Sequence, residues 1–354
     1  MKSSSEEPIR PLFLGIEGGG THTVAILADA RRNFLQRFEA GPANLKLLTD
    51  AQVLGLFKSI ASAFPAPDAL AIGMAGARSK PDWERMRIIA GKVWRDIPCH
   101  ATNDLETALA AAEGRDDVPE PARVLILSGT GSCCYGRNPN GKTAKIGGWG
   151  HILGDKGSGY EIGLRALKAV VYYFDRDGAW SKLGRQLLHR LQLNEPNELI
   201  AWAQAADKSQ IAGLAMEVFN AWQKGDKIAA DVLASAEDSL AEDAATCARQ
   251  LAGPRSTVRF ILAGSVLIKQ PNFAKLVGAR LKKIWPGAVV SPLERESAWG
   301  AVELAQKIWS GQAPVEKFLE PARKTPKVPK SPPLEKSLGN FGKVSPTEQR
   351  HPRS

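Results

Sequence analysis

The stretch Val124–Tyr160, VLILSGTGSCCYGRNPNGKTAKIGGWGHILGDKGSGY, decides the fold and the function expected of this chain. It begins with the apolar run Val124–Leu127, which predicts a buried strand, and continues directly into Ser-Gly-Thr-Gly-Ser at 128–132. Two further glycine clusters follow at 147–150 and 154–159. Glycine lets the backbone approach a ligand closely, and amides and hydroxyls at the end of a strand suit a polyphosphate. Three such clusters in one stretch indicate a binding site rather than isolated turns.

Length and composition indicate a globular protein of two domains. The chain has 354 residues, enough for two separate cores, with 44% hydrophobic and 24% charged residues. No apolar run reaches the roughly 20 residues of a membrane helix, and acidic residues near the start speak against an export signal. The cysteines form no CxxC pair, so we expect a cytoplasmic protein without a zinc or disulfide framework; they are Cys99, Cys133, Cys134 and Cys247.

The net charge of +10 is unevenly distributed. Residues 313–354 hold nine Lys or Arg against four Glu, so this Pro- and Lys-rich tail alone contributes about +5. Its composition predicts a disordered tail or linker that folding does not need. The remaining chain is mildly basic, which suits a phosphorylated small molecule, and it lacks the clustered charge with aromatics of a nucleic-acid face.

The first part of the chain predicts strand, glycine turn, strand. Strands are expected at Leu12–Glu17, Thr23–Ala28 and Asn33–Phe38, with Gly18-Gly19-Gly20-Thr21 joining the first two. This pattern fits a plain hairpin and fits equally a turn that wraps phosphates, with the Thr21 hydroxyl and the Glu17 carboxylate near a metal ion. A helix is expected to follow from Asp50, its proposed N-cap.

A carboxylate stands at a second strand end. After a strand at Leu70–Met74 and a helix from Pro81, Cys99–Asn103 reads as a strand that ends at Asp104, where the helix Leu105–Ala112 begins. Ligands of open α/β sheets bind at the carboxyl ends of strands, so Asp104 is a candidate catalytic group. Helix capping by Asp104 is the alternative.

The second part of the chain reads mainly as helices. A strand at Val258–Leu262 runs into Ala263-Gly264-Ser265-Val266, a further strand-to-glycine turn, and Ala288–Ser291 is the last strand. The expected helices are Glu161–Phe174, Trp180–Leu191, Asn197–Ala206, Ile211–Gln223, Lys227–Leu251, Phe273–Ile284 and Ser297–Trp309. Strands and helices that alternate in this way predict an α/β fold.

Taken together, these motifs resemble a known family. The chain is similar to the actin-like ATPases of the BadF/BadG type, and within them to the branch of N-acetylglucosamine, glucosamine and N-acetylmuramic acid kinases. The resemblance runs from about Leu12 to Trp309. The motifs that carry it are EGGGT (Glu17–Thr21), NDLETA (Asn103–Ala108), LSGTGS (Leu127–Ser132), GGWGHILGDKGS (Gly147–Ser158) and AGSV (Ala263–Val266).

The resemblance implies two actin-like (ribonuclease H-like) ATPase domains with a cleft between them that binds ATP, Mg²⁺ and an amino sugar. The domains would span 11–118 and 119–296, with the helix 297–310 packing back on the first. Asp104 would be the catalytic base, and Glu17 would hold the metal ion through water. ATP would be bound by Gly19, Gly20, Thr21, Gly129, Thr130, Gly264 and Ser265. The sugar would contact Asn44, Trp149, Gly150 and Asp155.

The chain departs from the family pattern at two places beside the expected sugar site. Lys156 stands where the family commonly has Glu, and Glu161 where it has an aromatic residue, so the sugar itself stays open. The Cys-rich zinc cluster of repressor-type glucokinases is missing, which disfavours that branch. The segment Ser345–Ser354 is similar to the start of N-acetylmuramic acid 6-phosphate etherases, with His351 where Asn is usual.

We therefore expect a kinase acting on the 6-hydroxyl of an amino sugar, N-acetylglucosamine or N-acetylmuramic acid, in cell-wall amino-sugar recycling. One alternative is an activator ATPase of the acyl-CoA reductase or dehydratase kind, which needs cysteines for an iron–sulfur cluster. Another is a non-catalytic sugar-sensing protein. A homodimer and a fused or partner etherase are left open, whereas nucleic-acid and membrane partners are not expected.

Overall fold

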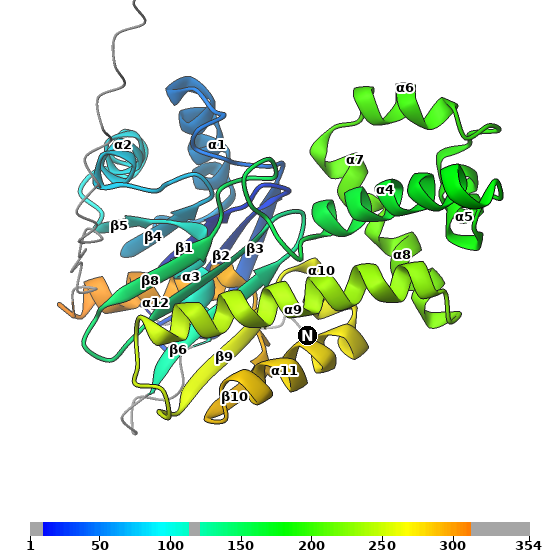
Figure 1. The fold of residues 1–354 in the computed structure, drawn as a ribbon. Coiled ribbons are helices and arrows are strands. Elements are labelled where there is room, and N and C mark those ends of the chain that lie inside the picture. Colours follow the sequence, from blue (N-terminus) through cyan, green and yellow to red (C-terminus); the bar gives the residue numbers. More distant parts are fainter. Residues whose placement is uncertain (1–9, 113–120, 313–354) are drawn as a thin grey trace, which may run out of the picture. The chain divides into compact units, whose positions relative to one another are not determined.

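A computed structural model of the chain describes residues 10–112 and 121–312 (Figure 1). The predicted domain boundary at residues 118–119, the Pro- and Lys-rich tail and the etherase-like segment Ser345–Ser354 lie outside the described residues. None of the helices in the described ranges is both long and apolar enough to cross a membrane.

The first sheet has five strands in the order β3-β2-β1-β4-β5. The first three strands are antiparallel neighbours, and β4 and β5 run parallel to β1. The strands are β1 (Phe13–Gly18), β2 (Thr23–Ala28), β3 (Phe34–Ala40), β4 (Ala69–Met74) and β5 (Cys99–Thr102).

The second sheet repeats this connectivity. Its order is β8-β7-β6-β9-β10, again with three antiparallel strands followed by two parallel ones. The strands are β6 (Ala122–Ser128), β7 (Ser132–Arg137), β8 (Thr143–Gly147), β9 (Val258–Ala263) and β10 (Ala288–Pro292). The α/β class is confirmed, and two sheets of the same connectivity are what two actin-like halves require.

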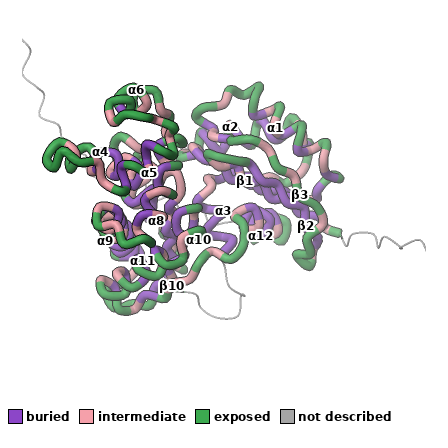
Figure 2. The backbone as a smooth tube through the Cα atoms, turned by 90° about the vertical axis from the view of Figure 1, so that its right-hand side faces the viewer, coloured by how far each residue is buried: buried purple, intermediate pink, exposed green. Residues whose placement is uncertain are grey.

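Helices cover both faces of the first sheet because its central strand is apolar on both sides. Leu14 and Ile16 of β1 share a buried cluster with residues of α1 (Asp50–Ala63) and α2 (Lys80–Gly91). Phe13, on the opposite face of β1, packs with residues of α12 (Ser297–Trp309), which also packs against α3 (Asp104–Ala111). The last helix therefore completes the core of the first sheet, and buried residues gather in β1 and α12 in Figure 2.

The second sheet packs against the remaining helices in one large apolar cluster. Between β8 and β9 the chain forms α4 (Gly159–Asp177), α5 (Lys182–Leu191), α6 (Glu198–Ala205), α7 (Lys208–Gly213), α8 (Ala215–Gln223) and α9 (Lys227–Arg249). The helices α10 (Ser265–Lys269) and α11 (Pro271–Ile284) connect β9 to β10.

Three local predictions were wrong. Thr49, not Asp50, caps α1. The Thr49 side chain accepts a hydrogen bond from the Gln52 amide, and the Gln52 side chain accepts one from the Thr49 amide, which is a capping box. The helix expected at 211–223 is two helices, because a second capping box at Asp207 starts α7 early and Gly213, a poor helix former, ends it. The short helix α10 directly after Gly264 was not predicted.

Candidate functional site

Asp104 is the first residue of α3 and follows the carboxyl end of β5. The preceding residue, Asn103, caps the helix: its side-chain oxygen accepts a hydrogen bond of 2.8 Å from the amide of Glu106. Capping by Asn103 means that the helix does not depend on the Asp104 side chain for its N-cap. The capping alternative for Asp104 is thereby weakened, and its carboxylate is available for other chemistry.

Two acidic groups meet near this point. Burial raises the pKa of Glu17, on β1, to about 8, and the neighbouring negative charges of Asp104 and Glu296 add to the effect. Burial also raises the pKa of Asp104, whereas backbone amides at the start of α3 and the cations Lys145 and Arg78 lower it. Buried carboxylates with shifted pKa values and cations close by are typical of functional sites.

This acid pair fits a divalent cation. Carboxylate oxygens are the ligands that Mg²⁺ prefers, and a cation beside Glu17 and Asp104 would relieve the repulsion that raises the pKa of Glu17. Among the described residues no group of three or more His, Cys, Asp or Glu side chains could hold a metal ion by itself. A metal ion here would therefore need ligands from bound phosphate and water as well.

The first glycine turn, residues 18–21, joins β1 to β2. The Gly19 amide donates to the carbonyl of His22 at 2.9 Å, and the Gly19 carbonyl accepts from the Ala43 amide at 2.9 Å. A side chain at Gly19 would begin 3.5 Å from Oε1 of Glu17, whereas the space around Gly20 is open and Thr21 is exposed. The turn thus presents free backbone and a hydroxyl beside the Glu17 carboxylate.

The second glycine turn, residues 128–132, lies against the third, residues 263–265. Gly264 has a φ of +87°, and a side chain there would lie 2.3 Å from the Ser128 carbonyl oxygen. Only glycine allows this approach. The Cβ position of Gly129 is 3.6 Å from Oγ of Ser265, so Gly129, Gly264 and Ser265 come together as the family resemblance requires. Thr130, which follows Gly129 in the chain, is half-buried.

Asn44 lies next to the end of β4. It forms an isolated parallel bridge with Ala75, and its side-chain oxygen accepts a hydrogen bond of 3.0 Å from the amide of Lys46. A side chain on Gly76 would lie 2.2 Å from that oxygen. Asn44 therefore orders its own turn, and the amide group is packed against the backbone that follows β4.

The loop after β8 carries the other predicted sugar residues. Trp149 is 66% exposed, Gly150 has a φ of +87°, and the neighbouring Ile152 and Leu153 are also exposed. Asp155, by contrast, is only 4% exposed. The loop therefore combines an uncovered apolar surface with a buried acid.

The charges of Asp155 and Asp104 both raise the pKa of the same buried thiol, that of Cys133. Cys133, on β7, has its pKa raised to about 12 mainly by burial, and the charges of Asp104 and Asp155 raise it further while Lys145 lowers it. The predicted base and the predicted sugar acid are thus electrostatic neighbours of one residue. In the described part of the chain no hydrogen bond joins the first glycine turn to the second or the third.

Lys208 contacts a predicted site residue and was not identified from the sequence. Its ammonium Nζ lies 2.7 Å from Oδ2 of Asp155. It belongs to α7 and to none of the recognised motifs, so only the three-dimensional structure reveals it. Lys145 and Arg78 were missed as well, although the alternation of β8 could have marked Lys145 as a solvent-facing cation.

A buried polar network ties α3 to the second sheet. Glu106, two residues after Asp104, accepts a hydrogen bond of 2.6 Å from the Tyr135 hydroxyl and forms an ion pair of 2.5 Å with Arg137. Tyr135 and Arg137 both belong to β7, which starts where the second glycine turn ends. The network therefore couples the position of the helix that carries Asp104 to this turn.

The two departures from the family pattern have local explanations. Glu161 accepts hydrogen bonds from the amide of Gly157 and from Arg165, so it stabilises the first turn of α4. Lys156 is exposed, and its charge partly offsets the burial that raises the pKa of Asp243. Neither side chain has a contact that assigns it to the sugar.

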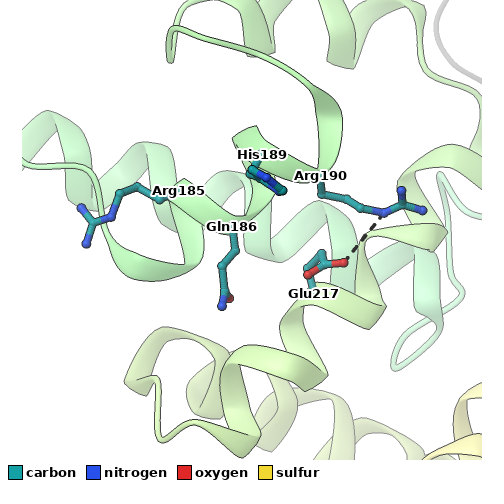
Figure 3. Close-up of a pocket in the computed structure, with 5 residues that line it drawn as sticks. All are labelled: Arg185, Gln186, His189, Arg190 and Glu217. Carbon is teal, nitrogen blue, oxygen red and sulfur yellow. Dashed lines mark ion pairs between the residues drawn. The ribbon is translucent and has the colours of Figure 1, made fainter.

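A separate pocket of about 360 Å³ lies between α5 and α8 (Figure 3). It is lined by Arg185, Gln186, His189, Arg190 and Glu217, none of which is a predicted site residue. Glu217 and Arg190 form an ion pair of 3.8 Å across it.

The chain is similar over most of its length to kinases of amino sugars. The chain is 29% identical over 303 residues to an N-acetylmuramic acid/N-acetylglucosamine kinase of Clostridium acetobutylicum, covering 83% of this chain and 97% of the relative. It is 26% identical to an N-acetyl-D-glucosamine kinase of Dictyostelium discoideum, covering 84% and 98%.

Solved structures match the fold over most of the chain. A Chromobacterium violaceum protein, provisionally described as an N-acetylglucosamine kinase, superposes with a TM-score of 0.62 at 26% identity over 83% of this chain and 98% of its own. A ROK-family glucokinase of Streptomyces griseus superposes with a TM-score of 0.51 over 84% and 99%; at 16% identity this likeness concerns the fold alone. A model of the BadF/BadG/BcrA/BcrD ATPase family matches residues 73–305, and the chain belongs to that family.

Proposed function

We propose that this chain is an ATP-dependent kinase that transfers the γ-phosphoryl group of ATP to the 6-hydroxyl of an amino sugar. N-acetylglucosamine and N-acetylmuramic acid are the favoured acceptors, and both kinase relatives carry such names. The observation that carries the proposal is the position of Asp104. It begins a helix that another residue caps, beside Glu17 and facing the cations Lys145 and Arg78.

Asp104 is the proposed general base. Phosphoryl transfer depends on positioning and charge neutralisation. The attacking hydroxyl must also lose its proton as its oxygen forms the bond to phosphorus. Burial raises the pKa of Asp104, which makes its carboxylate a better proton acceptor, while Lys145 and Arg78 keep the ionised form accessible. One carboxylate in this environment can take the proton.

The glycine turns are the proposed nucleotide site. Gly19, Gly20 and Thr21 would lie against the phosphate oxygens, as would Gly129 and Thr130, with Gly264 and Ser265 beside the adenosine. The amides of Gly19 and Gly129 already donate within their own turns, so the proposed phosphate donors are the Gly20 amide and the Thr21 and Thr130 hydroxyls. The contact between Gly129 and the third turn supports this assignment. Bound Mg²⁺ supplies positive charge to the phosphate oxygens, and Glu17 is the residue proposed to hold it through water.

The sugar is assigned to Asn44, Trp149, Gly150 and Asp155. The exposed Trp149 ring offers an apolar wall to a pyranose, and the buried Asp155 carboxylate is a hydrogen-bond acceptor for hydroxyl groups. Asn44 supports this role only in part, because its oxygen already accepts a hydrogen bond from Lys46. A place in cell-wall amino-sugar recycling follows from the proposed acceptors.

The alternative of an activator ATPase is not favoured. An iron–sulfur cluster shared between subunits needs accessible thiolates, whereas Cys133, Cys134 and Cys247 are buried and burial raises the pKa of each thiol. A non-catalytic sugar sensor is also not favoured, since such a protein has no need of a retained base such as Asp104.

The proposal is tested by measuring ADP release from Mg-ATP with N-acetylglucosamine, N-acetylmuramic acid, glucosamine and glucose. We expect turnover with at least one N-acetylated sugar and none with its 6-deoxy analogue, and phosphorus NMR of the product should show a 6-phosphate. An Asp104→Asn variant is the matched control for contaminating kinases. No turnover with any amino sugar would refute the proposed function, and equal turnover in the control would refute the role of Asp104 as the base.

A further inference from the structure

We propose that Lys208 is a positioning residue of the sugar site, whose ammonium group holds the Asp155 carboxylate in place against the second glycine turn. The inference rests on the proposed function, because it takes Asp155 to bind the sugar. Its direct support is the ion pair of 2.7 Å between Nζ of Lys208 and Oδ2 of Asp155.

The Asp155 carboxylate needs this partner because it is buried. Its side chain is 4% exposed, whereas that of Lys208 is 33% exposed. Among the hydrogen bonds of the described residues, the Lys208 ammonium is the donor to this carboxylate. An ionised carboxylate out of contact with water is costly unless it is paired, so the Lys208 ammonium is the partner that compensates for the burial of the Asp155 carboxylate.

The backbone around Asp155 is held in an uncommon conformation. Asp155 has a φ of +58°, in the left-handed region that non-glycine residues seldom adopt. Its carbonyl accepts a hydrogen bond of 3.1 Å from the amide of Ser158, the residue that caps α4. A conformation of this kind persists where the surroundings enforce it, and it aims the side chain inward toward Lys208.

The ion pair lies directly on the second glycine turn. A side chain on Gly131 would begin 2.9 Å from Oδ2 of Asp155 and 3.1 Å from Nζ of Lys208. Gly131 in turn accepts the amide hydrogen bond of Gly129 at 2.9 Å. The pair therefore touches the turn assigned to the phosphates while its acid is assigned to the sugar, which places Lys208 where the two substrates must meet.

The position of Lys208 itself is set by α7. Lys208 is the first residue of that helix, whose N-terminus is fixed by the capping box of Asp207 and Gln210. The helix crosses α4 closely, since a side chain on Gly163 would lie 2.1 Å from the Ile211 carbonyl oxygen. The capping box and the packing against α4 thus fix the position of the Lys208 ammonium beside Asp155, although α7 contains none of the motifs of the family.

With Lys208 in place, one carboxylate oxygen of Asp155 is bound and the other is left to accept a sugar hydroxyl. Removal of the ammonium takes away the hydrogen-bond donor of the buried Asp155 carboxylate, which is then no longer held against the second glycine turn. The hydrogen bond to the sugar is weakened as a result, while the nucleotide keeps its contacts with the glycine turns.

The test compares Lys208→Met, which keeps the length of the side chain without its charge, with Lys208→Arg, which keeps the charge. Lys182→Met is the matched control, because Lys182 is also the first residue of a capped helix and is exposed. We expect the sugar KM of Lys208→Met to rise about tenfold or more, with the ATP Kd unchanged within about twofold. Lys208→Arg should restore most of the sugar affinity, and Lys182→Met should behave as the wild type.

A double variant tests the coupling. If Lys208 acts through Asp155, Lys208→Met combined with Asp155→Asn should have the same sugar KM as Asp155→Asn alone. An unchanged sugar KM in Lys208→Met, additive effects in the double variant, or a parallel rise in the ATP Kd would each overturn the assignment. Turnover of the wild-type protein separates the two claims: an active wild type with an equally active Lys208→Met variant refutes only the role of Lys208, whereas an inactive wild type refutes both.

Discussion

Replacing Asp104 by Asn should abolish catalysis and leave the fold nearly intact. Loss of a general base costs about 10²–10⁴-fold in rate, which corresponds to about 2.7–5.4 kcal/mol of transition-state stabilisation. Asn is close in size to Asp and keeps a hydrogen-bonding oxygen, but it cannot accept the hydroxyl proton. The fall in kcat should therefore exceed any change in the binding of either substrate.

The structure allows the effect on stability to be bounded. Asn103 remains the N-cap of α3 in the variant, so the 2.8 Å capping bond to the Glu106 amide is kept. The acid at the first helical position is worth about 0.3–1 kcal/mol through the helix dipole. Relief of the repulsion between Asp104 and Glu17 acts in the opposite direction. The net change should stay below about 1 kcal/mol, and Tm should move by less than about 4 °C.

The assay measures kcat, sugar KM, ATP Kd and Tm on the same preparation of Asp104→Asn and wild type. The pKa of Glu17, about 8 in the wild type, should also fall in the variant because a neighbouring negative charge is gone. Near-normal turnover in a stable variant would show that Asp104 is not the base. A Tm lowered by 10 °C or so would refute the claim that Asn103 carries the cap.

Three other changes probe the site and its support. Asn44→Ala should raise the sugar KM and leave the ATP Kd unchanged; if only Tm falls, Asn44 serves its own turn with Lys46. Burial raises the pKa of Glu17 from 4.5 to about 8, so in buffer with a chelator the contribution of Glu17 to the free energy of unfolding should be full below about pH 4.5 and be lost as the pH rises through about 8. The urea midpoints of Glu17→Gln should lack this part of the pH dependence. Gly300→Ala should destabilise by about 1–3 kcal/mol or more, because the new methyl group would lie 1.9 Å from the Thr107 carbonyl oxygen; Gly55→Ala, in open space on α1, should not lower Tm.

The local sequence pattern predicted the bounds of a helix or strand correctly where a single signal, such as hydrophobic periodicity, dominated the segment. The helix Ser297–Trp309 was predicted with the bounds observed because small apolar residues recur along it at helical spacing. Strand Thr23–Ala28 was likewise predicted in full, since a continuous apolar run is bounded by a glycine turn. The acid at a strand end marked Asp104 for the same kind of reason: the end of a strand in an open sheet is where ligands bind.

The sequence could not supply contacts between segments far apart in the chain. Lys208 lies 53 positions from Asp155, and nothing in its neighbours distinguishes it from a solvated lysine at a helix start. The choice between Thr49 and Asp50 as a cap depends on φ and ψ values rather than on residue type, because both residues cap well. The close crossing of α7 with α4 is a further contact that no local pattern contains.

The crossing of α12 over β1 bears on how the chain folds as it leaves the ribosome. A side chain on Gly15 would lie 2.4 Å from the Ala298 carbonyl oxygen, so the strand made first is shaped to receive the helix made last. Until residue 309 has emerged, the face of the first sheet that carries Phe13 and Ile26 is covered only in part, by α3. The second sheet is complete once residue 292 has been made. The first sheet is therefore expected to complete its core only after the second sheet has been made, so its uncovered face stays open to chaperones until α12 has emerged.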